Sequence, residues 1–233
     1  MGIKENIEEV KRNIALAAEK AGRAPEDICL VGATKMNDAA RVREAIAAGL
    51  AICGENRVQE LREKNGQGAY EGAKLHFIGR LQKNKVKYVV GTAELIHSVD
   101  SVELMDEIHR KALDKGLIQD ILLEINVAGE ESKSGFRPED CASAIAHAAA
   151  LSGIRVRGLM TIPPVCESGE ENRPYFEMIR KLFIDNGEKK YDNIFMEFMS
   201  LGMSGDYRTA IDCGANMIRI GTAIFGQRIT RQR

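Results

Sequence analysis

ICLVGATKMNDAARVREAIAAGLAICGE, residues 28–55, contains a strand, a helix and a second strand in succession, and it decides the fold class. The run at 28–34 is short, apolar and followed by polar residues, which is typical of a buried strand. Residues 38–48 carry apolar side chains at helical spacing, and the run at 51–55 predicts the second strand. Because a crossover helix joins strands that run in the same direction, this unit indicates a parallel sheet.

The same alternation continues along the chain and predicts eight strands. They are expected at residues 28–34, 51–55, 75–79, 95–99, 120–127, 155–161, 195–201 and 217–222. Helices are expected within the first 22 residues and at 38–48, 57–64, 82–90, 101–115, 138–151, 174–185 and 204–213, with a truncated or absent helix after the last strand. Eight such units favour an α/β fold of one closed (β/α)8 TIM barrel. An open doubly wound sheet stays open as the alternative, because periodicity alone does not show closure.

The length and charge of the chain restrict its domain organisation and its partners. A length of 233 residues fits a single barrel, so we expect one domain over residues 1–233. The formal net charge of -1 gives no general electrostatic reason to expect nucleic acid or an anionic membrane as the partner.

Cysteine usage and the N-terminal segment indicate the compartment. The five cysteines are an odd number and form no CxxC pair, which predicts a reduced, cytoplasmic protein. The first 22 residues, MGIKENIEEVKRNIALAAEKAG, contain no apolar signal-peptide core. No apolar run has the length that a membrane-spanning helix requires.

Lys35 follows the first expected strand directly. Alternation along the strand places Lys35 on the same face as Val31 and Ala33, and both faces are apolar up to the lysine. A lysine at this end points either into the barrel mouth or into solvent. In a mouth of low dielectric, its amine would lose part of its affinity for protons and could condense with an aldehyde.

Two loops near the end of the chain are rich in small residues. MSLGMSGD, residues 199–206, follows the seventh strand and places Ser200 and Ser204 among glycines, where backbone N–H groups can bind an anion. The eighth strand ends at Gly221 and Thr222. Barrels frequently bind phosphate with these two loops. Ordinary turns remain the alternative, with Ser204 as a helix N-cap.

Arg219 is expected on the inward face of the eighth strand, beneath these loops. A buried arginine needs an acceptor. One interpretation gives it a carboxylate, Glu197 or Glu124. The other gives it a pyridine nitrogen, which its permanent positive charge would keep unprotonated.

Six ordered blocks of this sequence resemble the PLP-binding homeostasis proteins, where PLP is pyridoxal 5'-phosphate; the family is also called the proline synthetase co-transcribed homologues. The blocks are VGATK (31–35), CGENRVQE (53–60), LHFIGRLQKNK (75–85), INVAGEESKSGF (125–136), GLMTIPP (158–164) and MSLGMSGDYRTAIDCGANMIRIGTAIFG (199–226). The resemblance covers nearly the whole chain and implies the fold of the N-terminal domain of alanine racemase.

The resemblance also implies roles for individual residues. It implies that Lys35 forms an imine with PLP and that Arg219 is the partner of the pyridine nitrogen. It implies phosphate ligands at Ser200, Gly221 and Thr222, and pocket-wall residues at Asn56 and His76. From the residues alone, Asn56 is equally well interpreted as a helix N-cap, and His76 as a core histidine with its hydrogen bonds satisfied.

These observations predict a protein that holds PLP reversibly, with a role in vitamin B6 and amino-acid homeostasis and little or no catalysis. Racemisation needs acid–base groups on both faces of a planar intermediate. The racemase takes one of them from a second domain and a neighbouring subunit, which this chain of 233 residues is not expected to supply.

We expect PLP-requiring apo-enzymes as the partners and a monomeric chain. A PLP-dependent racemase or lyase using Lys35 and Tyr207 is the alternative. A barrel that binds another phosphorylated ligand is a third possibility.

Overall fold

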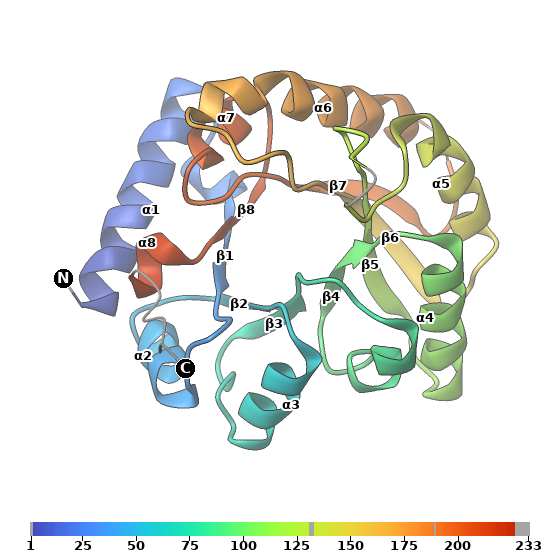
Figure 1. Ribbon diagram of the computed structural model, residues 1–233, viewed down its shortest axis with the longest axis horizontal. Coiled ribbons are helices and arrows are strands. Elements are labelled where there is room, and N and C mark those ends of the chain that lie inside the picture. The colour runs from blue at the N-terminus through green and yellow to red at the C-terminus, as the bar shows by residue number, and fades with distance from the viewer. Residues whose placement is uncertain (1, 131–132, 189, 227–233) are drawn as a thin grey trace.

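The computed structural model describes residues 2–130, 133–188 and 190–226, and within them eight parallel strands close into a barrel (Figure 1). The strands are β1 (Cys29–Ala33), β2 (Ile52–Glu55), β3 (Lys74–Phe77), β4 (Leu95–Val99), β5 (Gln119–Glu124), β6 (Ile154–Met160), β7 (Ile194–Ser200) and β8 (Met217–Ile220). The barrel closes because β8 pairs with β1, with Ile220 opposite Gly32. The predicted TIM barrel is confirmed, and the open sheet is excluded.

Helices surround the barrel in chain order, as Figure 1 shows. They are α1 (Ile3–Lys20), α2 (Ala39–Ala47), α3 (Val58–Gly66), α4 (Val102–Asp114), α5 (Cys141–Ala149), α6 (Arg173–Gly187), α7 (Tyr207–Asp212) and α8 (Thr222–Phe225). Short 3-10 helices are η1 (Pro25–Asp27), η2 (Lys83–Tyr88), η3 (Pro138–Asp140) and η4 (Gly169–Asn172). The truncated last helix that the sequence predicts is α8, a single turn.

The α-helix expected at 82–90 is the one element of the wrong type, because the chain forms the 3-10 helix η2 there. Val86 and Val89 are both fully buried and lie three residues apart. Side chains three apart eclipse one another in a 3-10 helix, which has three residues per turn, so this geometry turns both valines toward the core.

Strand alternation divides the apolar side chains into an inner and an outer layer. Those that fill the barrel interior are Val31, Ala33, Ile52, Ile78, Leu95, Leu122, Met160 and Met217. The side chains between them pack outward against the helices in a larger core. This alternation decides which polar side chains near the strand ends enter the barrel, and it places the site described below.

Within the described ranges, no helix combines the length and the apolar character that crossing a bilayer requires. No two of the five cysteines, all of which lie in those ranges, are joined by a disulfide.

Candidate functional site

Barrel closure brings the turn that contains Lys35 beside the end of β8. Lys35 is half-buried and follows β1 by two residues, in line with the inward-facing Val31 and Ala33. A Cβ atom placed on Gly221 would lie 3.3 Å from the Cβ of Ala33. Residues 33 and 221, which are far apart in the sequence, therefore meet at the carboxyl end of the barrel, where barrel enzymes build their sites.

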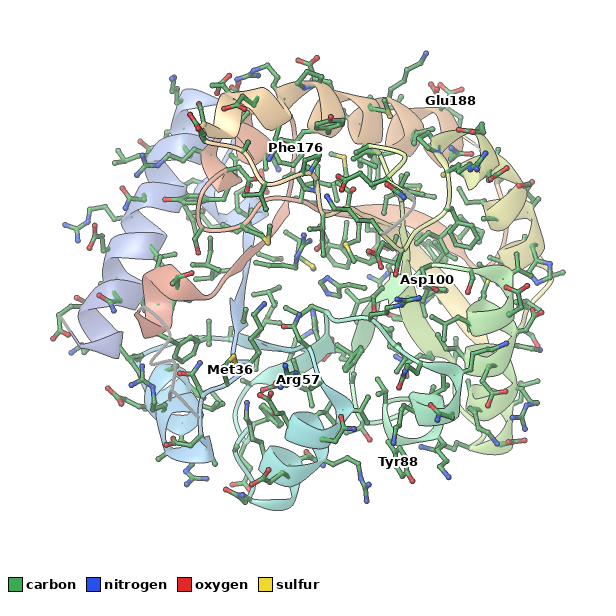
Figure 2. The ribbon with its side chains drawn as sticks, in the orientation of Figure 1. Met36, Arg57, Tyr88, Asp100, Phe176 and Glu188 are labelled. Atoms are coloured by element: carbon green, nitrogen blue, oxygen red, sulfur yellow. The ribbon has the colours of Figure 1, made fainter. Side chains whose placement is uncertain are left out.

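The turn after β1 is fixed from outside the barrel by α3. The N–H of Met36, which has a positive φ of 62°, donates to Glu60 Oε2 at 2.7 Å. Figure 2 shows Met36 and Arg57 near each other, and Arg57 lies 3.8 Å from the other oxygen of Glu60. Glu60 thus ties the Lys35 turn to the start of α3.

A second support for this turn is a buried group that we call the outer cluster: Thr34, Glu55, Lys64 and Tyr70. Lys64 Nζ donates to the carbonyl of Thr34 at 2.8 Å and to Glu55 Oε1 at 2.7 Å. The same oxygen accepts the hydroxyls of Thr34 at 2.5 Å and Tyr70 at 2.9 Å. Burial and the negative charge of Glu55 raise the pKa of the Tyr70 hydroxyl, so it stays a donor. The peptide before Lys35 is therefore held by a compensated ion pair.

The loop between β7 and α7 offers backbone donors. Gly202 has a φ of +80°, and a Cβ there would lie 2.7 Å from Ala210, so only glycine fits. Asp206 accepts the N–H of Met203 at 2.6 Å and the amide of Asn172 at 2.9 Å, which shapes the loop from within. The N–H groups of Ser204 and Gly205 donate to no other described residue. They remain available to an anion.

The alternative interpretation of Ser204 as a helix N-cap is wrong. The N-cap position of α7 is Asp206, two residues later. Ser204 is half-buried and borders, with Gly205, a hollow of about 660 Å³ that α1 also lines through Asn6 and Asn13. Thr222 is exposed and opens α8, where first-turn N–H groups have no intrahelical acceptor.

Arg219 lies in the barrel interior, where it reaches the ends of β7 and β6, and it is only 4% exposed. Its Nη1 donates to the carbonyl of Ser200 at 2.6 Å and to the Ser200 hydroxyl at 2.5 Å, and its Nη2 donates to the carbonyl of Thr161 at 2.8 Å. These bonds use three of the five guanidinium N–H groups. The Nε–H and one Nη2–H have no hydrogen-bond acceptor among the described residues.

Glu197 is not the partner of Arg219, so that prediction is wrong. Its side chain lies outside the barrel and accepts a hydrogen bond from Arg157 Nε at 3.0 Å. Glu124 faces the mouth but acts on Arg219 through charge only. Burial lowers the pKa of Arg219 to about 10, and Glu124 opposes that shift. Burial and the nearby Asp100 raise the pKa of Glu124 to about 7, while Arg219 and Arg80 lower it.

A hydrogen-bonded chain continues from Arg219 to β4 and β3, and we call it the inner chain: His76, His97, Ser200 and Arg219. The Ser200 hydroxyl lies 3.0 Å from His97 Nδ1, and His97 Nε2 lies 3.0 Å from His76 Nδ1. Burial lowers the pKa of His76 to about 3 and the pKa of His97 well below its usual value. Both imidazoles are therefore neutral near pH 7.

The remaining predicted site residues meet at the same end of the barrel. Asn56 follows β2, and its Oδ1 is enclosed without a hydrogen-bond partner among the described residues. It is not an N-cap, because that position of α3 is Arg57. His76 lies inside the barrel at 4% exposure, so its contact with His97 matches the interpretation as a satisfied core histidine.

Sequence reasoning assigned no role to His97. Leu95 lies in the interior layer, so alternation along β4 places His97 inward two residues later. Its partner Ser200 is 103 residues away, and no local pattern predicts that contact. Among the described residues, no three His, Cys, Asp or Glu side chains gather as a metal site would require.

The chain resembles known proteins over nearly its whole length. Residues 6–229 match the family model described as the alanine racemase N-terminal domain. The pyridoxal phosphate homeostasis protein of Aquifex aeolicus is 43% identical over 229 residues, which are 96% of this chain and 97% of the relative. The protein of the same name from Escherichia coli K12 is 36% identical over 231 residues, covering 97% of each chain.

Among solved structures, PipY of Synechococcus elongatus with PLP bound superimposes with a TM-score of 0.83. It is 29% identical, and the match covers 96% of this chain and 100% of PipY. The chain therefore belongs to the family of pyridoxal phosphate homeostasis proteins.

Proposed function

We propose that this protein holds PLP reversibly as an imine on Lys35 and takes part in PLP homeostasis. The observation that carries the proposal is the close approach of residues 33 and 221, which brings the strand end just before Lys35 next to the end of β8 and supports an amine beside the loops there. An amine and an anion site at adjacent strand ends match a ligand that is both an aldehyde and a phosphate ester. The PLP bound to PipY and the names of the relatives support the same ligand.

The residues at the mouth fit each part of PLP. The phosphate would be held by Ser200, by Gly221 and Thr222, and by the N–H groups near Ser204 that have no acceptor among the described residues. Asn56, whose enclosed oxygen has no partner in the described ranges, and His76, through the inner chain, would support the ring side. When bound, PLP supplies an electron-withdrawing ring conjugated to the imine.

Arg219 limits what that ring can do. Two of its N–H groups have no acceptor within the part of the chain that the structure describes, and its pKa of about 10 leaves it a cation near pH 7. A pyridine nitrogen beside this cation would accept a hydrogen bond and stay unprotonated, because a second positive charge there is repelled. An unprotonated ring is a poor electron sink, so this arrangement favours holding PLP over catalysis with it.

The candidate base of the rival enzyme is poorly placed. Tyr207 is 7% exposed and packs in the outer core beneath the helices. A racemase needs acid–base groups on both faces of the reacting carbon, and Tyr207 is not placed to supply one of them.

Glu124 is the residue that favours a second candidate function, a racemase or lyase. It faces the mouth, and its pKa is raised to about 7.

The finer parts of the proposal concern organisation and partners. We propose that residues 1–233 form one domain, that the protein is a monomer in the cytoplasm, and that PLP-requiring apo-enzymes receive the cofactor. The closed barrel supports the single domain, and the unbridged cysteines support the cytoplasmic location.

Titration with PLP, followed by visible absorption, tests the proposed function. The wild type and a Lys74→Ala control, whose exposed lysine pairs with Glu94, are expected to form an imine band of equal intensity. Lys35→Ala is expected to form none. An unchanged band in Lys35→Ala would overturn the role of Lys35.

Incubation with L-amino acids in deuterated water separates the two candidate functions. We expect exchange of the α-hydrogen to be absent or far below enzymatic rates. Exchange at enzymatic rates that is lost in Glu124→Gln would establish the second candidate instead.

A further inference from the structure

The inner chain runs through the barrel interior as one unbroken series of hydrogen bonds. It passes from Arg219 on β8 to Ser200 on β7, then to His97 on β4 and His76 on β3. His97 and Ser200 are completely buried, and the other two side chains are each 4% exposed. Water therefore has little access to these groups, which bond to one another and, for Arg219, to the carbonyls of Ser200 and Thr161.

The protonation states in the chain are coupled. A neutral imidazole has one donor nitrogen and one acceptor nitrogen. Both nitrogens of His97 are engaged, Nδ1 with Ser200 and Nε2 with His76. When His97 donates to Ser200 it must accept from His76, and when it accepts from Ser200 it must donate to His76. The two histidines therefore share one tautomer, Nδ1–H or Nε2–H.

The Ser200 hydroxyl connects this choice to the ligand. Arg219 can only donate, so it occupies one lone pair of the hydroxyl oxygen. If Ser200 donates its single proton to His97, it has none to offer an anion. If His97 donates to Ser200, the hydroxyl proton is available to a phosphate oxygen.

We propose that His97 and His76 are positioning residues whose shared tautomer changes when an anion binds at Ser200. The inference rests on the proposed function, because it takes Ser200 as a phosphate ligand. Without the anion, His97 is the acceptor for the Ser200 proton, and both histidines are Nε2–H. With the anion bound, Ser200 donates to the phosphate, and both histidines become Nδ1–H.

The change moves protons without changing net charge. The Ser200 proton passes to His97 Nδ1, and the His97 Nε2 proton passes to His76 Nδ1. The His76 Nε2 proton leaves to solvent, and Ser200 takes one proton from solvent. In the arrangement with the anion, His76 Nδ1–H donates to His97, His97 Nδ1–H donates to Ser200, and the Ser200 hydroxyl donates to the anion, so the histidines leave the Ser200 proton to the ligand.

Nitrogen-15 NMR of the histidine side chains tests this inference, because the protein has only four histidines. Protonated and unprotonated ring nitrogens have well-separated shifts, so each tautomer is read directly. His147→Gln and His109→Gln assign the two signals from helices α5 and α4. Spectra are recorded for the free protein, with inorganic phosphate and with PLP.

We expect His76 and His97 to show Nε2–H in the free protein and Nδ1–H with PLP or saturating phosphate. Tautomers that stay the same while the imine band forms would overturn the inference and leave the proposed function intact. Absence of the imine band would overturn the proposed function, and phosphate alone would still test the tautomer change.

Variants separate a positioning role from a structural one. In Ser200→Ala, PLP is expected to leave both tautomers unchanged, with affinity for PLP about tenfold lower or more. In His97→Gln, whose amide can still bridge Ser200 and His76, we expect most of that affinity to be retained. If Ser200→Ala bound PLP with wild-type affinity and both histidines still changed tautomer, the proposed link between Ser200 and the histidine tautomer would be contradicted. His147→Gln, on the helix surface beside Asp106, is the matched control for both measurements.

Discussion

The outer cluster and the inner chain are two buried polar groups on opposite sides of the same barrel wall. In the outer cluster, the charge of Lys64 lies 2.7 Å from that of Glu55, so the two charges compensate each other. In the inner chain, the charged group is Arg219, which is bonded to carbonyls and a hydroxyl and to no carboxylate of residues 2–130, 133–188 and 190–226. The first group balances its charges without a ligand, although Glu55 Oε2 has no hydrogen-bond partner among the described residues, and the second carries a cation with no carboxylate bonded to it.

This difference assigns the two groups different tasks. A compensated ion pair holds the backbone in place, here the peptide before Lys35. An unpaired buried cation costs stability on its own and is expected where an anionic or electron-rich ligand completes the site. Substitutions in the outer cluster should therefore change stability first, and substitutions in the inner chain should change ligand binding first.

The largest expected effect is that of Lys64→Met. It removes the cation from beside Glu55, which is fully buried, and leaves an uncompensated carboxylate. We expect the free energy of unfolding to fall by about 3–5 kcal/mol in urea titrations. Lys74→Met, which breaks an exposed pair with Glu94, is the control and should cost less than about 1 kcal/mol. Equal losses in the two variants would remove the distinction between the two groups.

The raised pKa of Glu124, at the barrel mouth, predicts that the free energy of unfolding depends on pH. Burial raises its pKa from 4.5 to about 7, so between these values the folded protein binds more protons than the unfolded chain. Stability should therefore fall as the pH rises through this range, by at most about 3 kcal/mol from this group. Glu124→Gln should flatten the dependence and be the more stable protein at pH 8. Urea titrations at pH 5 and pH 8 measure both, and parallel curves would contradict the shift.

Arg219→Met should change stability least and binding most. The variant loses hydrogen bonds to two carbonyls but also removes a buried charge, so we expect a change of at most about 2 kcal/mol in unfolding. Its affinity for PLP should fall about tenfold or more, because the ring nitrogen loses its donor. Calorimetric titration with PLP beside urea unfolding measures the two effects. If Arg219→Met lost as much stability as Lys64→Met, Arg219 would have a structural role like that of the outer cluster, and the distinction between the two groups would fail.

Much of the fold was predictable from local patterns. All eight strands lie within three residues of their expected limits, because alternation and flanking turns mark buried parallel strands clearly. Closure was not predictable in this way, since the pairing of β8 with β1 joins the two ends of the chain. The 3-10 helix at Lys83–Tyr88 was missed because its apolar spacing fits either helix type over so short a length.

The candidate site was predictable where strand ends define it. Alternation along the strands predicts that Arg219 and Ala33, two residues before Lys35, point into the barrel. Both side chains do so in the structure. The partners of Arg219 were not predictable, because backbone carbonyls of other strands leave no signature in the sequence. The link from Ser200 to His97 likewise depends on side chains that meet only across the closed barrel.

Reduction of the PLP-loaded protein with borohydride, followed by peptide mass spectrometry, tests the central claim most directly. Borohydride converts an imine into a stable secondary amine and so marks the lysine that carried the cofactor. The account predicts a pyridoxyl group on the peptide that contains Lys35 and on no other in stoichiometric amount. A modification at another lysine, or none at Lys35, would contradict it.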